Sequence, residues 1–270
     1  MSKKVPLLKI KNLKKQFDTL PVLKGLSLEI HEGEFVVIIG PSGAGKSTFL
    51  RCINQIIIPD CGEIRVNNEN IIGLKRKDLR KIQSNIGMIF QHHNLSIKTN
   101  VFKNVLQGRL GRHSFIRTFL GAYPEVEKQE ALDILKKVGL ESVLYKKAGA
   151  LSGGQMQRVG VCRAIMQSSK LLLADEPIAS LDPTTAKIVM EELYSLATER
   201  GITCIVNLHQ IHFAKNYATR VIGIKKGEIV FDGAPELLTD NIIHEIYEGN
   251  IDEVEYAPEE KKVGVWNYAT

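Results

Sequence analysis

The feature that most constrains this chain is a glycine-rich turn between an apolar run and a segment with helical spacing. The turn reads Gly-Pro-Ser-Gly-Ala-Gly-Lys-Ser over residues 40–47, and the apolar run before it covers residues 35–39. A strand, a glycine-rich loop and a helix in this order form a phosphate-binding loop, in which backbone N–H groups at the helix N-terminus surround a phosphate. The chain is therefore expected to build an α/β sheet around a nucleotide-phosphate site.

Two side chains at the end of this loop are expected to act on the phosphates directly. The Lys46 ammonium should reach the β- and γ-phosphates, and the Ser47 hydroxyl should coordinate Mg²⁺. The backbone N–H groups of residues 43–48 should point at the bound anion, which the positive end of the helix dipole also favours. The loop therefore predicts nucleotide binding with Mg²⁺ as cofactor.

A pair of carboxylates follows a second apolar run. Residues 171–174 read Leu-Leu-Leu-Ala and are followed by Asp175 and Glu176. By itself, an Asp-Glu pair before a proline is more often a solvated turn, but the strand before it places these side chains at the carboxyl edge of the sheet, beside the phosphate loop. Asp175 is then expected to hold Mg²⁺, and Glu176 to act as the general base that polarises the attacking water.

Short apolar runs alternate with longer segments of helical spacing, which is typical of an α/β protein. Strands are expected at residues 7–10, 26–30, 35–39, 64–66, 86–89, 171–174, 203–207, 221–224 and 229–231. Helices are expected at residues 47–56, 125–138, 155–167 and 183–198. Runs that are apolar throughout suit parallel strands covered on both faces. The first three strands precede every helix and are expected to form an antiparallel addition, and residues 101–138 a helical insertion.

Composition and cysteine spacing exclude several classes of protein. With 270 residues, of which 44% are hydrophobic and 24% charged, the chain is neither disordered nor collagen-like nor a disulfide-stapled mini-fold. Residues 1–10 contain no apolar stretch of signal-peptide length, and no apolar run approaches the roughly 20 residues that span a bilayer. A cytosolic chain with at most a peripheral membrane role is therefore expected. The cysteines lack metal-site spacing and are expected to be buried free thiols: Cys52, Cys61, Cys162 and Cys204.

The net charge of +6 comes from one acid-free window. Residues 79–124 hold seven Lys or Arg and no Asp or Glu, so the rest of the chain carries 29 basic and 30 acidic residues. Aromatic residues are interspersed with these charges, which would also suit single-stranded nucleic acid. They are Phe102, Phe115, Phe119 and Tyr123. Their helix-like spacing favours a core role instead, so no nucleic-acid partner is expected.

A second glycine-rich helix N-terminus identifies a family resemblance. Residues 151–155 read Leu-Ser-Gly-Gly-Gln, and Gln155 stands 20 residues before Asp175. Together with the elements above, this signature resembles the ATP-binding cassette (ABC) family over about residues 5–249. The remaining family elements occur in the expected order: Phe17, Gln91, the Ser-Leu-Asp of residues 180–182, and His209.

The resemblance implies a P-loop ATPase fold and a site shared between two chains. Residues implied to bind ATP within one chain are Phe17, Gly40, Pro41, Ser42, Gly43, Ala44, Gly45, Lys46, Ser47 and Thr48. Residues implied to cover the same ATP from a second chain are Ser152, Gly153, Gly154, Gln155 and Asp182. Glu176, His209 and Gln91 are implied to be catalytic, and Ser47, Gln91 and Asp175 to hold Mg²⁺. One phosphate loop and one signature per chain imply an ATP-dependent homodimer.

Further stretches resemble the phosphonate-importer branch of this family. They include residues 104–112, 175–182, 206–210 and 231–235. The resemblance implies an ATPase subunit at the cytoplasmic face of the membrane that works with an integral-membrane permease and, through it, an external solute-binding protein. A cassette that regulates cell-envelope machinery without moving a solute would carry nearly the same motifs. The domain is expected over residues 5–249, with a helical subdomain at about 99–165 and an acidic extension at 250–270.

The acid-free window includes Gln91 and the residues after it, a region that meets the permease in cassettes of this family. Its charge is therefore expected to face a permease surface near anionic lipid headgroups, although a plain solvated face would look the same. On this hypothesis, reversing Arg109 and Arg112 to Glu abolishes permease association and leaves ATP binding intact.

Overall fold

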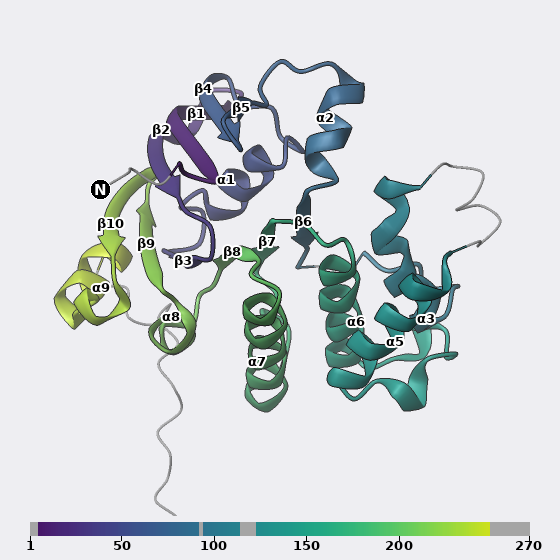
Figure 1. The fold of residues 1–270 in the computed structure, drawn as a ribbon. Coiled ribbons are helices and arrows are strands. Elements are labelled where there is room, and N and C mark those ends of the chain that lie inside the picture. The colour runs from purple at the N-terminus through teal and green to yellow at the C-terminus, as the bar shows by residue number, and fades with distance from the viewer. Residues whose placement is uncertain (1–4, 92–93, 114–122, 249–270) are drawn as a thin grey trace, which may run out of the picture.

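Two β-sheets and a layer of helices stack on one another in the computed structural model, which describes residues 5–91, 94–113 and 123–248. Figure 1 shows the antiparallel sheet and α1 (Lys46–Ile53) on one face of the central sheet, and α7 (Pro183–Glu199) and α8 (Ile211–Tyr217) on the other. Within the described residues, no helix has both the length and the apolar character needed to cross a membrane.

The central sheet has six strands, five of them parallel. Its order is β10 (Glu228–Gly233), β9 (Arg220–Lys225), β3 (Phe35–Ile39), β8 (Thr203–Asn207), β7 (Leu171–Asp175) and β6 (Ile86–Ile89). Only β10 runs antiparallel to its neighbour. The second sheet is antiparallel, in the order β2 (Leu20–Ile30), β1 (Leu8–Phe17), β4 (Cys61–Val66) and β5 (Glu69–Asn70). These sheets confirm the α/β prediction of a mainly parallel core with an antiparallel addition.

Strand β3 joins the two hydrophobic cores. Phe35, Val37 and Ile39 pack into the core beneath the helical layer. Val36 and Ile38 pack on the opposite side, against the antiparallel sheet and α1. Successive strand residues point to opposite faces, so an uninterrupted apolar run is required when both faces are covered.

The expectation that the first three strands form the antiparallel addition was wrong for the third. Strands β1 and β2 do pair antiparallel, but β3 lies between β8 and β9 in the central sheet, and β4 and β5 complete the addition. The burial patterns give the physical reason: β1 and β2 mix buried with exposed residues, whereas all five residues of β3 are buried. Chain order before the first helix was therefore a weaker signal than two-sided burial.

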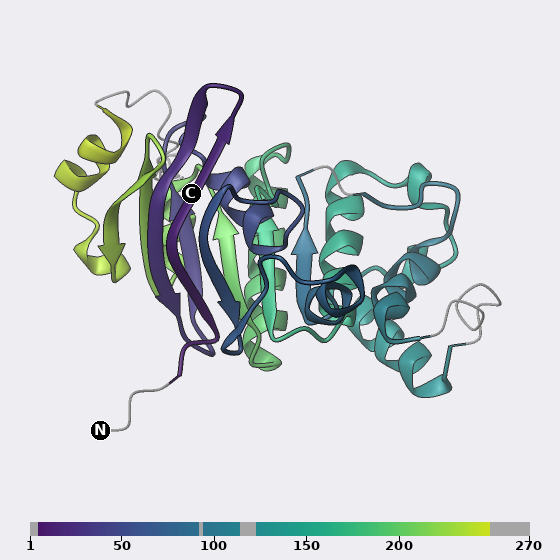
Figure 2. The same ribbon diagram turned by 90° about the horizontal axis from the view of Figure 1, so that it is seen from above.

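Eight α-helices are found among the described residues. They are α1, α2 (Arg76–Gln83), α3 (Val101–Leu106), α5 (Glu125–Lys137), α6 (Gly153–Met166), α7, α8 and α9 (Asp240–Tyr247), with four 3₁₀ turns, η1 (Gln107–Arg112), η2 (Glu141–Val143), η3 (Ala148–Ala150) and η4 (Pro235–Leu237). Helices α3, α5 and α6 gather beyond β6, away from the antiparallel sheet (Figure 2). The domain bounds, including the subdomain at 99–165, stay predictions, and the 250–270 extension lies outside the described residues.

Cysteine burial matches the expectation at three of four positions. Cys52, Cys162 and Cys204 are buried, and burial raises the pKa of the Cys52 thiol to about 12, so that this thiol is unreactive at neutral pH. Cys61 is exposed, which corrects the expectation. It begins β4 beyond a register shift in the β1–β4 pairing, outside the core between the two sheets.

The acid-free window is only partly a surface feature, which corrects the hypothesis about Arg109. Arg109 is 7% exposed, and its guanidinium pairs with Glu130 of α5 and lies 3.8 Å from Glu127. Burial opposes the ionisation of Glu130, but the Arg200 and Arg109 guanidinium groups outweigh burial and lower its pKa. Much of the charge of Arg109 is therefore neutralised inside the helical layer. Arg112 remains exposed and donates to the Ser168 carbonyl at 2.8 Å.

Replacing Arg109 with Leu is expected to lower the free energy of unfolding by about 2 kcal/mol, because the carboxylate of Glu130 loses one of two guanidinium partners in a half-buried setting. Urea denaturation measures the change. The matched control is Arg112→Leu, in the same 3₁₀ turn but exposed, with an expected change under about 1 kcal/mol. Equal losses in both variants would contradict a buried structural role for Arg109.

Candidate nucleotide site

The phosphate loop connects β3 to α1, and its first glycine is required by a close backbone approach. Gly40 has φ +149°, and a Cβ added there would lie 2.0 Å from the Ile224 carbonyl oxygen of β9. Gly45 is the N-cap of α1 at φ +101°, where side chains are disfavoured. The loop is thus held against β9 while its N–H groups lead into the N-terminus of α1, as the sequence predicted.

Lys46 is buried at the head of α1 and turns back onto the loop. Its ammonium donates to the Gly40 carbonyl at 2.6 Å and to the Pro41 carbonyl at 3.0 Å. A hollow of about 480 Å³ lies over the loop. It is lined by Leu20, Val22, Ser42, Gly43, Ala44, Gly45, Lys46, Ser47, Thr48, Glu176 and His209. Loop, ammonium and carboxylate therefore share one cavity.

Asp175 is held by two residues that the sequence analysis missed. Its carboxylate is 1% exposed, lies 3.0 Å from the Arg51 guanidinium, and accepts a 3.1 Å hydrogen bond from the Asn207 side-chain amide. Both had a sequence signal. Arg51 follows Ser47 by four residues on one helix, so the two side chains share a face. Asn207 ends the strand that pairs with Asp175 in parallel register.

Two of the residues implied to be catalytic, Glu176 and His209, contact each other. His209 Nε2 lies 2.8 Å from Glu176 Oε1, and since an ionised carboxylate only accepts hydrogen bonds, Nε2 carries the proton in this contact. The hydrogen bond from His209 is the largest cause of a lowered pKa for Glu176; burial opposes it, while Lys46 and Arg51 add to it. Glu176 is therefore ionised at neutral pH, as a general base must be.

Phe17 and Gln91 are not among the residues that line this hollow. Phe17 is 44% exposed and pairs across the β1–β2 hairpin with Leu20, which lines the cavity. The Lys15 ammonium lies 5.4 Å from the centre of its ring. Gln91 is half-buried and follows β6 by two residues, on the edge of the sheet where Asp175 ends β7. The roles implied for them, ATP binding for Phe17 and Mg²⁺ binding for Gln91, stay predictions.

The signature residues lie elsewhere in the same chain, at the start of α6. The Ser152 hydroxyl accepts from the Gln155 N–H at 3.3 Å, and the Ser152 N–H donates to the Gln155 side chain at 3.1 Å, a reciprocal cap. A Cβ on Gly154 would lie 2.3 Å from a methyl carbon of Thr185, so α6 begins against the start of α7. Asp182, the exposed N-cap of α7, accepts from the Thr185 N–H at 3.0 Å.

Two helix N-termini therefore face solvent side by side, separate from the residues that line the hollow. A family model described as ABC transporter matches residues 23–179, more than half of the chain and including both glycine-rich motifs. The chain belongs to the ABC transporter family.

Curated members of the ABC transporter family resemble this chain over nearly its whole length. "Phosphonates import ATP-binding protein PhnC 2" of Oceanobacillus iheyensis is 49% identical over 242 residues, which cover 89% of this chain and 95% of the relative. "Phosphonates import ATP-binding protein PhnC" of Treponema denticola is 47% identical over 239 residues, 88% of this chain and 93% of the relative. Both alignments include the phosphate loop, the signature and the Asp-Glu pair.

Solved structures of ABC cassettes share the fold. The cbiO1 cassette of Clostridium perfringens, part of the ABC transporter complex cbiONQ, superposes with a TM-score of 0.76 at 30% identity and covers 89% of this chain and 93% of its own. The cassette MJ0796, described as a dimeric post-hydrolysis state bound to ADP and Pi, has a TM-score of 0.73 at 36% identity and covers 84% of this chain and 98% of its own.

The side chains predicted to hold Mg²⁺ carry oxygen donors of the kind that this ion prefers. Ser47 offers a hydroxyl, Asp175 a carboxylate and Gln91 an amide oxygen, the hard donors that Mg²⁺ prefers. The Asn207 side-chain oxygen is also buried, without a hydrogen-bond partner, beside Asp175. Among the described residues no cluster of three or more His, Cys, Asp or Glu forms a closed metal cage. An open site completed by phosphate oxygens and water suits this donor set better than a structural metal.

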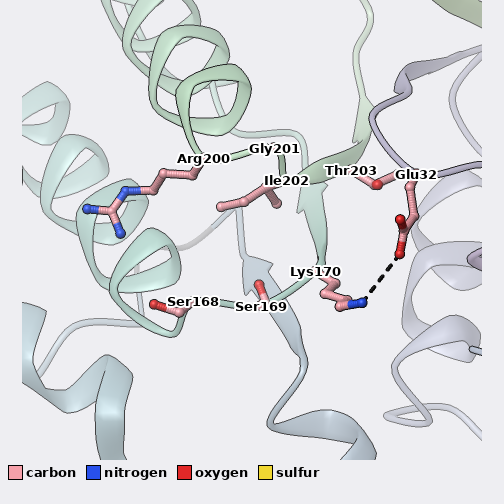
Figure 3. A pocket seen from close by; sticks show the side chains of 8 residues that line it. All are labelled: Glu32, Ser168, Ser169, Lys170, Arg200, Gly201, Ile202 and Thr203. Carbon is pink, nitrogen blue, oxygen red and sulfur yellow. Dashed lines mark hydrogen bonds and ion pairs between the residues drawn. The ribbon is translucent and has the colours of Figure 1, made fainter.

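A second hollow, of about 440 Å³, lies at the amino ends of β3, β7 and β8 and is not the ABC site. Figure 3 shows the Lys170 ammonium directed at Glu32, 3.4 Å away, and the Arg200 side chain directed away from both. Arg200 pairs with Glu130 at 2.6 Å. The cations near this hollow are therefore paired with carboxylates of the same chain, and nothing in its lining resembles a phosphate loop.

Removing the His209 ring is expected to raise the pKa of Glu176 towards its ordinary value of 4.5, because the hydrogen bond that lowers it is lost. Since the folded-state pKa of Glu176 is the lowered one, this contact stabilises the fold above about pH 4.5 and ceases to do so as pH falls through that folded pKa. Carbon NMR titration of labelled Glu carboxylates in His209→Ala measures the pKa of Glu176. His244→Ala, an exposed histidine of α9, is the control; an unchanged Glu176 titration in His209→Ala would refute the coupling.

Proposed function

We propose that this chain is the ATP-hydrolysing subunit of an ABC importer for phosphonate or a related phosphorus oxyanion. The observation that carries the proposal is near-50% identity, over about nine-tenths of the chain, to proteins named as phosphonate import ATP-binding subunits. The regulatory alternative, a cassette that moves no solute, finds no such support among these relatives. The cargo itself is selected outside the cell, so an external solute-binding protein completes the proposed system.

The proposed reaction is hydrolysis of ATP between two copies of the chain. The phosphate loop and Lys46 bind the phosphates of one ATP, and Phe17 supports its adenine. When bound, Mg²⁺ neutralises the phosphate charge and aligns the reacting oxygens. Glu176 accepts a proton from the attacking water, and His209, already hydrogen-bonded to Glu176, orients that carboxylate. Gln91 senses the metal and the water from the neighbouring strand end.

A second copy is proposed to complete the site, because the signature residues are not among those that line the hollow over the phosphate loop of the same chain. Ser152 and Gly153 are exposed at the start of α6, where the positive end of the helix dipole favours an anion. A head-to-tail pair of chains places this surface over the partner's phosphate loop. The MJ0796 cassette, similar over 84% of this chain and described as dimeric, supports the pairing of two copies.

The permease is proposed to dock in a groove of about 1,070 Å³ between α2 and β6 on one side and η1 and α6 on the other. Arg80, Phe90 and Leu110 line it, and Phe90 is followed directly by Gln91. Arg163 of α6 donates to the Asn94 carbonyl at 2.6 Å, so the segment after Gln91 is bonded to the signature helix. A permease segment that binds in the groove would therefore act both on Gln91, the proposed Mg²⁺ sensor, and on α6, the helix that begins with the signature. With a permease docked in this groove, the proposed location of the chain is the cytoplasmic face of the membrane, as a peripheral subunit.

Replacing Glu176 with Gln is expected to reduce ATP hydrolysis at least about a hundredfold, because the amide cannot accept the proton of the attacking water. ATP binding should persist, so the variant should accumulate as a dimer in the presence of ATP. Turnover measured by phosphate release and size-exclusion chromatography with ATP test both outcomes. Glu191→Gln, an exposed residue of α7, is the matched control. Wild-type turnover in Glu176→Gln would remove this residue from the role of base.

Reversing a groove charge is expected to weaken the complex without affecting the ATP site. Arg80→Glu should reduce the amount of permease that co-purifies with the chain, because an acidic side chain would face a surface close to anionic lipid. Lys24→Glu, an equal reversal at an exposed position of β2, is the control.

In the wild-type complex, ATPase activity should rise when the binding protein carries a phosphonate. Equal permease recovery in both variants would exclude the groove, and stimulation only by a phosphorus-free solute would exclude the proposed cargo.

A further inference from the structure

Helix α9, the last of the helices in the described residues, reaches the phosphate loop without lining the nucleotide hollow. Its last residue, Tyr247, is 1% exposed and is the largest of the fully buried side chains among the described residues. The Tyr247 hydroxyl accepts a hydrogen bond from the Gly40 N–H at 3.3 Å. A residue 207 positions later in the chain therefore contacts the first residue of the loop that receives the phosphates.

This contact satisfies two buried polar groups at once. A buried backbone N–H requires a partner, and so does a buried tyrosine hydroxyl. Gly40 also has little freedom to move, because a Cβ there would lie 2.0 Å from the Ile224 carbonyl, and its own carbonyl accepts from Lys46. The hydroxyl thus holds the one residue at which the strand turns into the phosphate loop.

A second contact ties the same end of α9 to the loop through the turn between β9 and β10. The Gly227 N–H in that turn donates to the Ala44 carbonyl of the loop at 3.1 Å. Two lysines bind this β9–β10 turn to the end of α9. Lys226 pairs with Glu248 at 2.5 Å, and Lys225 donates to the Glu245 carbonyl at 2.6 Å. An open hollow of about 340 Å³ lies between these residues and the loop.

We propose that Tyr247 is a positioning residue for nucleotide binding, which preorganises the phosphate loop through the Gly40 N–H. Its ring packs in the hydrophobic core, and its hydroxyl accepts from the Gly40 N–H of the loop, so removing the hydroxyl tests the second role while the ring is kept. A loop that is already ordered loses less conformational freedom when a nucleotide binds, which improves affinity without adding a contact to the ligand. The inference rests on the proposed ATP binding and adds a residue that no motif of the family indicated.

Tyr247→Phe tests the role of the hydroxyl, because it keeps the ring in the core. In the full-length chain, calorimetric titration with ADP and Mg²⁺ should show a Kd about five- to tenfold higher than wild type, equivalent to about 1–1.4 kcal/mol. The KM for ATP should rise by the same factor and kcat should stay within about twofold, since the groups that perform the chemistry are unchanged. The matched control is Tyr217→Phe. Tyr217 is a half-buried tyrosine of α8 that packs against Phe213, and its substitution should leave the Kd for ADP unchanged.

A purely structural role for Tyr247 predicts a lower unfolding temperature without nucleotide but an unchanged Kd for the folded fraction, and that result would overturn the proposal. Wild-type protein that binds no ADP would count against the proposed function itself. If Tyr247→Phe does not fold, hydrogen exchange on the nucleotide-free wild-type protein tests the proposal instead. The Gly40 amide should then exchange as slowly as the amide of Ile39 in β3. Rapid exchange at Gly40 would show that the hydroxyl does not hold the loop.

Discussion

The burial of β3 on both faces is the constraint on which the rest of the structure depends. Its five apolar residues divide between two cores, one under the helical layer and one under the antiparallel sheet. A strand held on both sides cannot shift in register without moving apolar groups into the wrong layer. The phosphate loop begins at the residue after this strand. Because the two cores hold the strand in place, they also hold the start of the phosphate loop in place.

The parallel pairing of neighbouring strands brings the chemistry to one edge of the sheet. Asp175 and Asn207 are paired in register at the ends of β7 and β8, and Glu176 and His209 follow within two residues. All four side chains therefore arrive beside the phosphate loop. The left-handed backbone of Glu176, at φ +51°, turns its carboxylate towards His209. Such a conformation is costly for a residue other than glycine and suits a position held for function.

The helical layer presents the second half of the site on a different surface. The cap of α6 and the N-cap of α7 are packed together through Gly154 and Thr185, which fixes two helix N-termini in one orientation. Ion pairs in which Glu130 lies between Arg109 and Arg200 join η1, α5 and the end of α7 beneath them. The same layer that neutralises part of the basic window therefore positions the surface proposed to meet a second chain.

Motifs with a strict local requirement were legible in the sequence: the phosphate loop, the apolar strand before Asp175 and the capping residues of α6 each act through backbone geometry within a few residues. Nearly all strands were found for the same reason. Short helices such as α8, with seven residues, were missed because they carry too few turns for periodicity to show. The sheet to which β3 belongs was misassigned because chain order was weighed above burial.

The sequence by itself therefore determined the fold class, the family and the place of the glycine-rich loop between a strand and a helix, since these depend on spacing along the chain. Tertiary structure decided which charges are available and which residues act together. From the sequence, Arg109 was expected to be an exposed basic side chain, but in the fold it is buried in an ion pair. Tyr247 contacts Gly40, which lies 207 positions earlier in the chain. The physical reason is that burial and hydrogen bonding depend on neighbours brought together by packing, whose distance along the chain carries no local signal.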